Sequence, residues 1–259
     1  LAQKGHMVFA GVRSQKAVEE LKKLSNDVHP IILEVTSRES ILNALKHIEG
    51  IISGNGLNGL VNNAAIAISA PIEFVPIEEV QKQLDVNVTG LIETTQIFLP
   101  LLRKGGGRIV NVGSLSGLLT TPFLGPYCAS KYAVEAINDA MRMELHSSGI
   151  KVSLIEPGSI ATPMWKNSLS MAVELEKKML PGHLNYRKGV DSFREVAIKT
   201  GEAGIGPEKV AVKIEHALCS PNPKTRYLVG KEAFVYAVIK KILPDRVFDY
   251  LIYKELKMK

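Results

Sequence analysis

The chain has 259 residues, of which 46% are hydrophobic and 22% are charged, and its formal net charge is +6. These proportions are typical of folded globular domains and exclude a disordered chain. The lysines are scattered among acidic residues, so the excess positive charge does not indicate nucleic-acid binding, although it favours a phosphorylated ligand. No uninterrupted apolar run approaches the ~20 residues that span a bilayer.

Short apolar runs alternate with longer amphipathic segments, which predicts a parallel sheet covered by helices on both faces. The predicted strands, in chain order, are Met7–Val12, Ile31–Val35, Gly59–Asn62, Arg108–Val112, Lys151–Ile155 and Tyr227–Val229. Helices fill most of the gaps, and Ala133, Ile137 and Met141 form an apolar stripe on one of them, which Gly149 should end. Because no linker divides the chain, we predict a single doubly wound α/β domain in three layers over residues 1–259.

The two cysteines, Cys128 and Cys219, are too few for a disulfide framework and fit a reducing, cytoplasmic compartment. Cys128 has no accompanying histidine or asparagine motif, so we expect a helix-packing residue rather than a nucleophile. The six histidines show no close metal-ligand spacing, and no metal site is predicted.

A candidate catalytic group lies where the fourth predicted strand ends and the next helix begins. Ser114 closes the apolar run, and Tyr127 and Lys131 follow four residues apart, which places both on one face of a helix. At ~4 Å and an effective dielectric constant of ~20, a unit positive charge is worth about 4 kcal/mol. That energy is enough to lower a phenol pKa of ~10 by about three units. We therefore expect Lys131 to make Tyr127 more acidic, and Ser114 to hold a carbonyl oxygen whose charge changes.

The tyrosine–lysine spacing does not identify Tyr127 by itself. Five of the seven tyrosines have a lysine four residues on, namely Tyr127, Tyr227, Tyr236, Tyr250 and Tyr253. Tyr127 differs from the others because a serine ends a predicted strand thirteen residues earlier and a Pro157-Gly158 turn follows the next strand.

Several motifs in fixed order make the chain resemble the short-chain dehydrogenase/reductase family over nearly its whole length. They are Asn62-Asn63-Ala64-Ala65, Asn87-Val88-Thr89-Gly90, Gly113-Ser114, Tyr127 to Lys131, and Pro157-Gly158 through Thr162. Each is weak alone, but their agreement at these separations is specific. The resemblance implies a Rossmann-like fold, hydride transfer between a nicotinamide cofactor and an alcohol or ketone, and a homo-oligomer.

By this resemblance, Tyr127 is the general acid/base, Lys131 lowers its pKa and holds the nicotinamide ribose, and Ser114 positions the substrate carbonyl. Asn87 would hold a water molecule in the proton relay. A helix kink or cap is the alternative interpretation of Asn87.

Arg13 follows the first predicted strand, where the family reads the adenosine ribose. Val12 stands where an acidic residue would select NAD, and a guanidinium can pair with a 2′-phosphate. We therefore expect NADP(H) as the preferred cofactor and NAD(H) as the alternative, unless Arg13 is only a solvated charge. The further cofactor contacts that the resemblance implies are Glu34, Val35, Asn63, Ala64, Ala65, Tyr127, Lys131, Pro157, Gly158, Ile160 and Thr162. Glu34 and Ala65 depart from the family's Asp and Gly, and Ala65 is tolerable only if its backbone φ is negative.

The family opens with a strand and a Thr-Gly-x-x-x-Gly-x-Gly turn whose amides hold the cofactor pyrophosphate, and this chain has neither. Leu1–Gly5 reads as the end of a helix, so we expect an amino-terminally truncated fragment. Since the family's first strand is central in the sheet, its absence should leave two strands unpaired and the phosphate-binding turn missing. We expect these 259 residues alone to bind nicotinamide cofactor poorly; micromolar affinity in a fluorescence titration would contradict this.

Two segments outside the motifs indicate the substrate class. Residues 159–205 form an insertion with apolar residues that include Met164, Trp165, Met179 and Leu180, and such insertions commonly cover a ligand. We predict a substrate lid, with Met164 and Trp165 touching the substrate beside Ser114 and Tyr127; ordinary packing is the alternative.

The helical tail of residues 231–259 and the preceding Tyr227–Gly230 resemble the retinol and steroid (17-beta-hydroxysteroid) dehydrogenase branch of the family. A lipophilic substrate such as a steroid, retinoid or long-chain carbonyl compound is therefore expected. Core or dimer packing is our first interpretation of the tail, and peripheral contact with a membrane is the alternative. The rival functions are a catalytically idle cofactor-binding scaffold and a membrane-surface module.

Overall fold

The computed structural model describes residues 1–177 and 181–258. Its strands are β1 (Val8–Val12), β2 (Val28–Ile32), β3 (Gly59–Asn62), β4 (Arg108–Val112), β5 (Lys151–Pro157) and β6 (Arg226–Val229). They form a two-stranded sheet, β1-β2, and a four-stranded sheet of order β3-β4-β5-β6. Every pairing is parallel, which confirms the predicted doubly wound α/β architecture.

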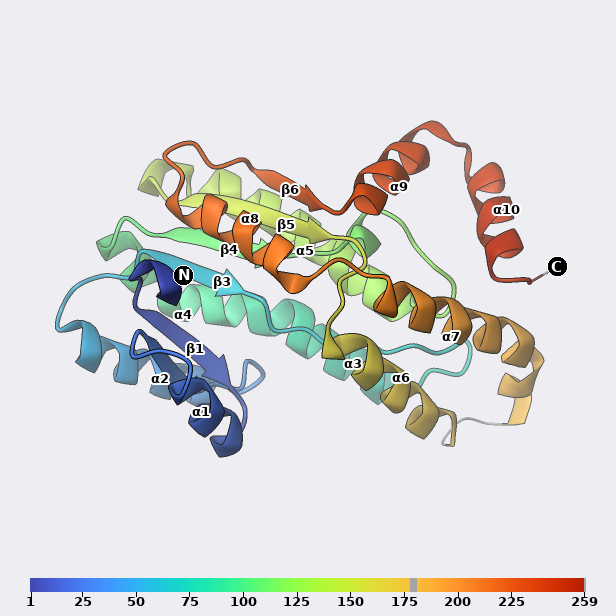
Figure 1. Cartoon of the computed structure of the whole chain (residues 1–259), viewed down its shortest axis with the longest axis horizontal. Helices are drawn as coiled ribbons and strands as arrows, with labels where there is room; N and C mark the ends of the chain where they lie inside the picture. The colour runs from blue at the N-terminus through green and yellow to red at the C-terminus, as the bar shows by residue number, and fades with distance from the viewer. Residues whose placement is uncertain (178–180, 259) are drawn as a thin grey trace.

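Helices cover both faces of the four-stranded sheet, with α4 and α5 on one side and α8 on the other (Figure 1). The α-helices are α1 (Gln15–Lys22), α2 (Arg38–Ile52), α3 (Ile77–Leu84), α4 (Gly90–Lys104), α5 (Gly125–Glu144), α6 (Pro163–Glu176), α7 (Arg187–Glu202), α8 (Pro207–Cys219), α9 (Lys231–Ile242) and α10 (Asp245–Glu255). Short helical turns are η1 (Ala2–Lys4), η2 (Asp85–Thr89), η3 (Leu115–Gly117), η4 (His146–Ser148) and η5 (Pro181–Tyr186).

The core follows from the alternation of side chains along the central strands. Leu154 and Ile155 of β5 are both fully buried but point to opposite faces. Leu154 packs with Leu91 of α4 and Val134 of α5, whereas Ile155 packs on the α8 side. Such strands, buried on both faces, read as continuous apolar runs, and so they are predictable from sequence.

The predicted second strand, Ile31–Val35, is shifted from the observed β2. In the structure β2 begins at Val28 and ends at Ile32, and Pro30 lies inside it opposite Ala10 of β1. Proline has no N–H for a ladder hydrogen bond, but β2 is an edge strand, where this loss is tolerated. The proline caused the sequence analysis to start the strand too late.

The predicted apolar stripe of α5 is also rotated. Ile137 and Met141 pack against the core as expected, but the buried face is centred on Lys131, Val134 and Asn138. The helix ends at Glu144, and η4 then leads to Gly149, whose φ of 71° is the left-handed conformation expected of a terminator.

The two-stranded sheet of β1 and β2 lies apart from the four-stranded sheet that begins with β3. A cavity of about 1830 Å³ runs between β1 and β3, and its lining includes Leu33, Phe98 and Leu218. Within residues 1–177 and 181–258, neither strand has a hydrogen-bonded neighbour on the edge that faces this cavity. The groove therefore interrupts the sheet between β1 and β3.

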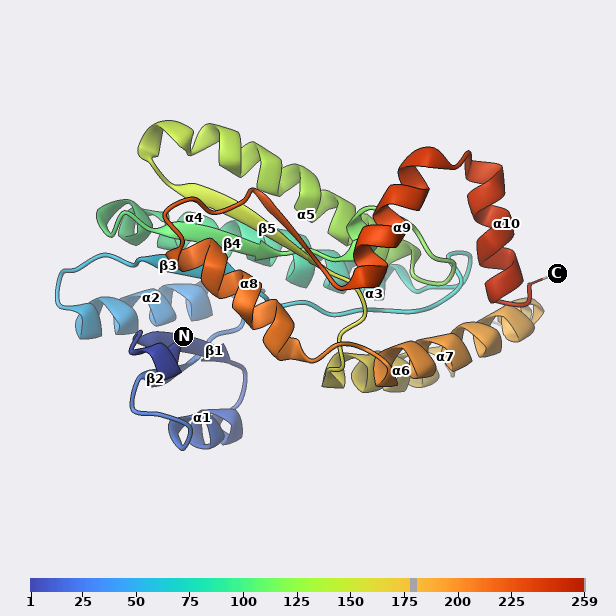
Figure 2. The same ribbon diagram turned by 45° about the horizontal axis from the view of Figure 1, so that its top comes forward.

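The insertion and the tail pack together around a second hydrophobic cluster. It joins Phe123 of the loop after β4, Phe193 of α7, and Phe248 and Ile252 of α10. Figure 2 shows α9 and α10 at the end of the sheet toward which the strands point, near α6 and α7. Met179 and Leu180 lie outside the described residues. This cluster surrounds the segment that leads into α5.

Candidate active site

The carboxyl ends of the parallel strands meet at one edge of the four-stranded sheet, and three of the predicted catalytic residues lie there. The amide of Gly113, directly after β4, donates to Ile155 O of β5 at 2.8 Å, which fixes the backbone just before Ser114. Ser114 caps η3, with its Oγ accepting from Ser116 N at 3.1 Å, and its hydroxyl lies near enough to the Tyr127 phenol to lower the pKa of that phenol. The structure thus brings together Ser114 and Tyr127.

Lys131 follows Tyr127 by one turn of α5 and is only 3% exposed. Its Nζ donates to Val112 O at 2.9 Å and lies 5.8 Å from the centroid of the Tyr127 ring. The ammonium group is therefore near Tyr127 but bonded to the last residue of β4.

The expected acidification of Tyr127 is not found in this arrangement. Burial raises the pKa of the Tyr127 phenol to about 12, and the hydrogen bond with Ser114 opposes this only in part. Burial also lowers the pKa of Lys131 to about 8, an effect that the negative charge of Glu135 opposes. The prediction was wrong here because it counted the attraction of one cation without the cost of removing both groups from water.

Asn87 lies in the π-helical turn η2 and is buried. Its amide group accepts from Ile66 N at 2.8 Å and donates to Ile66 O at 2.9 Å and to Ser130 Oγ at 3.0 Å. These bonds tie η2 to the segment after β3 and to α5. They are tertiary bonds rather than a helix cap, and the role of Asn87 in a proton relay stays a prediction.

The residues predicted at the adenosine end of the cofactor line one groove. They are Arg13, Glu34, Val35, Asn63, Ala64 and Ala65. Arg13 is exposed, and Ala65 is not among the described residues with positive φ, so the substitution of glycine is sterically acceptable. The carboxylate of Glu34 accepts hydrogen bonds from Thr36 N at 3.2 Å and from Thr36 Oγ1 at 3.0 Å. The open groove and its free guanidinium fit the adenosine end of a dinucleotide.

The residues predicted at the nicotinamide end follow β5. Pro157 pairs with Val229 of β6, and Gly158 N donates to Val229 O at 2.9 Å. Ile160 forms a bridge with Ile205, and its carbonyl accepts from Trp165 Nε1 at 2.8 Å. Thr162 begins α6 without a side-chain cap, so its hydroxyl is not engaged there.

Trp165 is largely committed to packing. Besides its bond to Ile160, it packs against the second hydrophobic cluster, and a Cβ on Gly201 would approach its ring to 2.8 Å. Met164 is half-buried beside it. These contacts favour the packing alternative for Trp165, and substrate contact by both residues stays a prediction.

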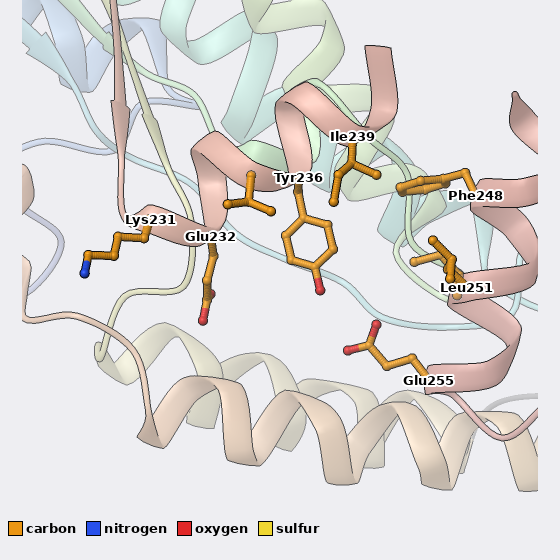
Figure 3. A pocket seen from close by; sticks show the side chains of 9 residues that line it. Lys231, Glu232, Tyr236, Ile239, Phe248, Leu251 and Glu255 are labelled. Carbon is orange, nitrogen blue, oxygen red and sulfur yellow. The ribbon is translucent and has the colours of Figure 1, made fainter. Parts of the chain in front are cut away.

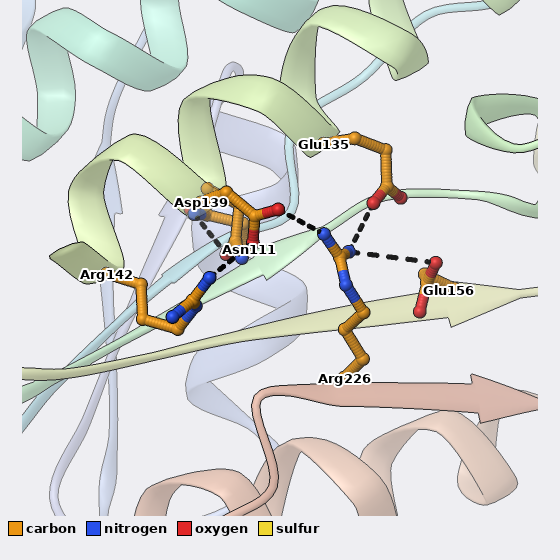
Figure 4. A network of polar contacts seen from close by, with 7 residues as sticks. Asn111, Glu135, Asp139, Arg142, Glu156 and Arg226 are labelled. Atoms are coloured by element: carbon orange, nitrogen blue, oxygen red, sulfur yellow. Dashed lines mark hydrogen bonds and ion pairs between the residues drawn. The ribbon is translucent and has the colours of Figure 1, made fainter.

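Sequence reasoning missed a partly buried charge cluster between α5 and the strands β5 and β6. Arg226 of β6 contacts Glu135 and lies 2.7 Å from Asp139, both on α5, and 3.9 Å from Glu156 of β5 (Figure 4). Burial and the charge of Glu156 raise the pKa of Glu135 to about 8, against the effect of Arg226, and burial raises the pKa of Glu156. A signal was present, because Tyr127, Lys131, Glu135 and Asp139 repeat every four residues on one face of α5.

A second cavity, of about 490 Å³, lies between α9 and α10. Tyr236 of α9 and Phe248, Leu251 and Glu255 of α10 point into it (Figure 3). None of the predicted catalytic or cofactor-binding residues lines this cavity, so it is separate from the candidate active site.

A parallel doubly wound sheet with a nucleotide-sized groove and a Ser–Tyr–Lys group at its carboxyl edge defines a dinucleotide-dependent oxidoreductase. The family model of the short chain dehydrogenases matches residues 1–172. The chain belongs to the short-chain dehydrogenase family, and it is an NAD(P)-dependent oxidoreductase of the class that interconverts alcohols and ketones.

Curated relatives cover nearly the whole chain. An NADPH-dependent 3-dehydrocapnine reductase of Ornithobacterium rhinotracheale is 35% identical, over 98% of this chain and 90% of the relative. A 17-beta-hydroxysteroid dehydrogenase type 6 of Bos taurus is 37% identical, over 96% and 80%. Retinol dehydrogenase 16 of Mus musculus is 35% identical, over 98% and 82%. The expected likeness to the retinol and steroid branch is confirmed.

Solved structures show the same fold. A short-chain dehydrogenase from Streptomyces avermitilis has a TM-score of 0.77 at 22% identity, covering 99% of this chain and 90% of its own. One from Burkholderia cenocepacia in complex with NADP has a TM-score of 0.70 at 22% identity, covering 95% and 86%.

The described residues contain neither a candidate membrane-spanning helix nor a candidate metal site. No helix among them has the length and apolar character needed to cross a membrane. Over the same residues, no three His, Cys, Asp or Glu side chains gather as metal ligands would.

Proposed function

We propose that this protein is an NADP-preferring oxidoreductase that transfers a hydride between nicotinamide and a secondary alcohol or ketone of a lipophilic substrate, such as a steroid, a retinoid or a long-chain carbonyl compound. The observation that carries the proposal is the buried ammonium group of Lys131, 5.8 Å from the centroid of the Tyr127 ring and bonded to the end of β4, directly before Gly113 and Ser114. The printed names of the relatives, which include steroid and retinol dehydrogenases, support the substrate class.

The residues suggest a division of roles. The nicotinamide ring supplies or accepts the hydride. Tyr127, whose pKa is raised to about 12, keeps its proton at neutral pH and can donate it to a carbonyl oxygen. Ser114 donates a hydrogen bond to the same oxygen and so favours the negative charge that develops there. Lys131 lies close enough to stabilise the phenolate that Tyr127 becomes after donation.

The test replaces Tyr127 by phenylalanine, which removes the acidic proton and keeps the ring. The chain should be expressed both as the 259 residues and within its natural reading frame. We expect Tyr127→Phe to retain NADPH binding by fluorescence while ketone reduction falls roughly 10²–10⁴-fold. Tyr236→Phe is the matched control, because Tyr236 also has a lysine four residues on, and it should keep its turnover. Near-normal turnover of Tyr127→Phe would remove Tyr127 from the mechanism.

The cofactor preference is argued from the adenosine end of the groove. Arg13 is exposed at the end of β1 and lines the groove with Glu34 and Val35. A guanidinium recognises a phosphate by paired, charge-assisted hydrogen bonds. The NADPH-dependent relative supports the same preference. Exchanging Arg13 for glutamine should raise the KM for NADPH roughly tenfold and leave that for NADH unchanged; an equal change for both would contradict a role in phosphate recognition.

Contact with a membrane surface is a second candidate function, favoured by the outer face of α9. Phe234 and Ile242 are 63% and 72% exposed, and Val238, which lies four residues from each, extends the same apolar surface. Truncation after Lys231 is a poor test, because it would also remove Phe248 and Ile252 from the second cluster. Pelleting with anionic liposomes should instead be compared between the natural chain and a Phe234→Ser/Ile242→Ser variant. Equal pelleting would discard α9 as a membrane contact.

A catalytically idle scaffold of the same fold is the remaining rival. It predicts NADPH binding with no turnover of any lipophilic alcohol or ketone in a substrate panel. The oxidoreductase hypothesis predicts turnover that disappears in Tyr127→Phe. The substrate panel, measured on both proteins, therefore distinguishes the two hypotheses.

A further inference from the structure

Glu135 occupies the space beneath the loop that presents Ser114. A Cβ added to Gly117 would lie 3.2 Å from Glu135 Oε1, and one added to Gly113 would lie 3.5 Å from the same atom. The same Cβ on Gly117 would lie 2.9 Å from Lys131 O. The two glycines on either side of Ser114 therefore let one turn of α5, from Lys131 to Glu135, pack directly against this loop.

The two oxygens of the Glu135 carboxyl group have different surroundings. Oε2 contacts the guanidinium of Arg226, whereas Oε1 is buried and makes no hydrogen bond within the described residues. The side chain is only 12% exposed. A buried polar oxygen without a partner costs free energy, so packing alone does not explain a carboxyl group at this position.

The neighbouring Lys131 suggests a role for the carboxyl group of Glu135. Its ammonium is buried, and its hydrogen bond is to the neutral carbonyl of Val112. Glu135 lies one helical turn further on, at the spacing where side chains of opposite charge interact. The other charged groups around Glu135 are Asp139 on α5, Glu156 on β5 and Arg226 on β6, and Lys241 of α9 acts on Glu156. Arg226 holds the acidic groups together, and the charge of Glu135 acts on Lys131 one helical turn away.

We propose that Glu135 is a positioning residue for this enzyme: once it ionises on the alkaline side it keeps Lys131 in its cationic form, and it braces the Gly113–Gly117 loop that presents Ser114. The inference rests on the proposed function, since it assigns a role to Glu135 through two residues of that reaction. Glu135 itself touches neither substrate nor cofactor in this role.

The first test is the pH dependence of ketone reduction by Glu135→Gln, which removes the charge and keeps the shape. Loss of a negative charge lowers the pKa of Lys131 and of the Tyr127 phenol alike. Reduction needs both groups protonated, so the alkaline limb of the kcat/KM profile should move down by about one pH unit. Glu135→Asp, which retains the charge, should restore most of the profile.

Asp139→Asn is the matched control, because Asp139 shares Arg226 but lies one turn further from Lys131. Its alkaline limb should coincide with that of the natural enzyme. A folded Glu135→Gln enzyme with an unchanged profile would overturn the proposal, and so would an equal shift in Asp139→Asn.

A second measurement does not depend on turnover. The Lys131 side chain can be titrated by NMR, with its resonance assigned by Lys131→Arg. The midpoint should fall in Glu135→Gln and stay in Asp139→Asn; an unchanged midpoint in Glu135→Gln would refute the charge effect. If the natural enzyme reduces no substrate, the proposed function fails while this titration still decides the role of Glu135.

Discussion

Helices α5 and α9 carry the same tyrosine–lysine spacing in different surroundings, Tyr127–Lys131 at the start of α5 and Tyr236–Lys240 toward the end of α9. Lys131 of α5 is 3% exposed, and its ammonium bonds to the backbone carbonyl of Val112. Lys240 of α9 instead pairs with Asp245 at 2.6 Å and lies 5.0 Å from the centroid of the Phe248 ring. The spacing places two side chains on one helical face in both cases.

The difference shows that the surroundings of a tyrosine–lysine pair, and not its spacing, give the pair the shifted pKa values of a candidate catalytic group. At the carboxyl edge of a parallel sheet, Tyr127 and Lys131 lose water, so burial raises the pKa of the Tyr127 phenol and lowers the pKa of the Lys131 ammonium group. On the surface helix pair α9–α10, the lysine already has a carboxylate partner, so its pKa is raised by the hydrogen bond to Asp245.

The largest expected effect comes from removing each lysine in turn. Lys131→Met should lower ketone reduction roughly 10²–10⁴-fold, because the phenolate of Tyr127 loses its nearby cation. Lys240→Met should leave kcat and KM unchanged within twofold. Steady-state kinetics on both variants checks this, and similar losses in the two would erase the distinction between the helices.

The next effect sharpens the view that α10 serves packing. Phe248 is buried in the second cluster beneath Lys240, so Phe248→Ala should lower the free energy of unfolding by about 3–5 kcal/mol. Ile242→Ser, at a position that is 72% exposed, should leave it nearly unchanged. Urea denaturation measures both, and a small loss in Phe248→Ala would mean that α10 is not held by this cluster.

The smallest effect concerns the coupling of stability to pH. Burial lowers the pKa of Lys131 from its ordinary value of 10.5 to about 8, so the folded chain binds fewer protons than the unfolded chain between these values. Its contribution to stability therefore rises with pH across that window, by about 1–3 kcal/mol. Urea denaturation of the natural protein and of Lys131→Met, each at pH 7.5 and 10, isolates it. Parallel changes in the two proteins would show that Lys131 is not destabilised by burial.

Much of the fold could be predicted because the central strands are short apolar runs, such as Arg108–Val112. The shift of β2 was missed because Pro30 is unusual in a strand unless the strand lies at an edge, and edges depend on the whole sheet. Ser114, Tyr127 and Lys131 could be placed because helix geometry and one strand end are local features. The partner of Glu135 could not, since Arg226 is 91 residues away and joins it only when β6 adds to β5.

The hydrogen bond from Lys131 to Val112 has a consequence for the binding of a lipophilic substrate at the candidate active site. Because the ammonium group of Lys131 is bonded to the strand and the Tyr127 phenol keeps its proton, the groups available to a substrate oxygen are two neutral donors, the hydroxyls of Ser114 and Tyr127. A lipophilic substrate would then remove no water from an ionised group when it binds. The free energy needed to separate charge would be required only once the reaction begins.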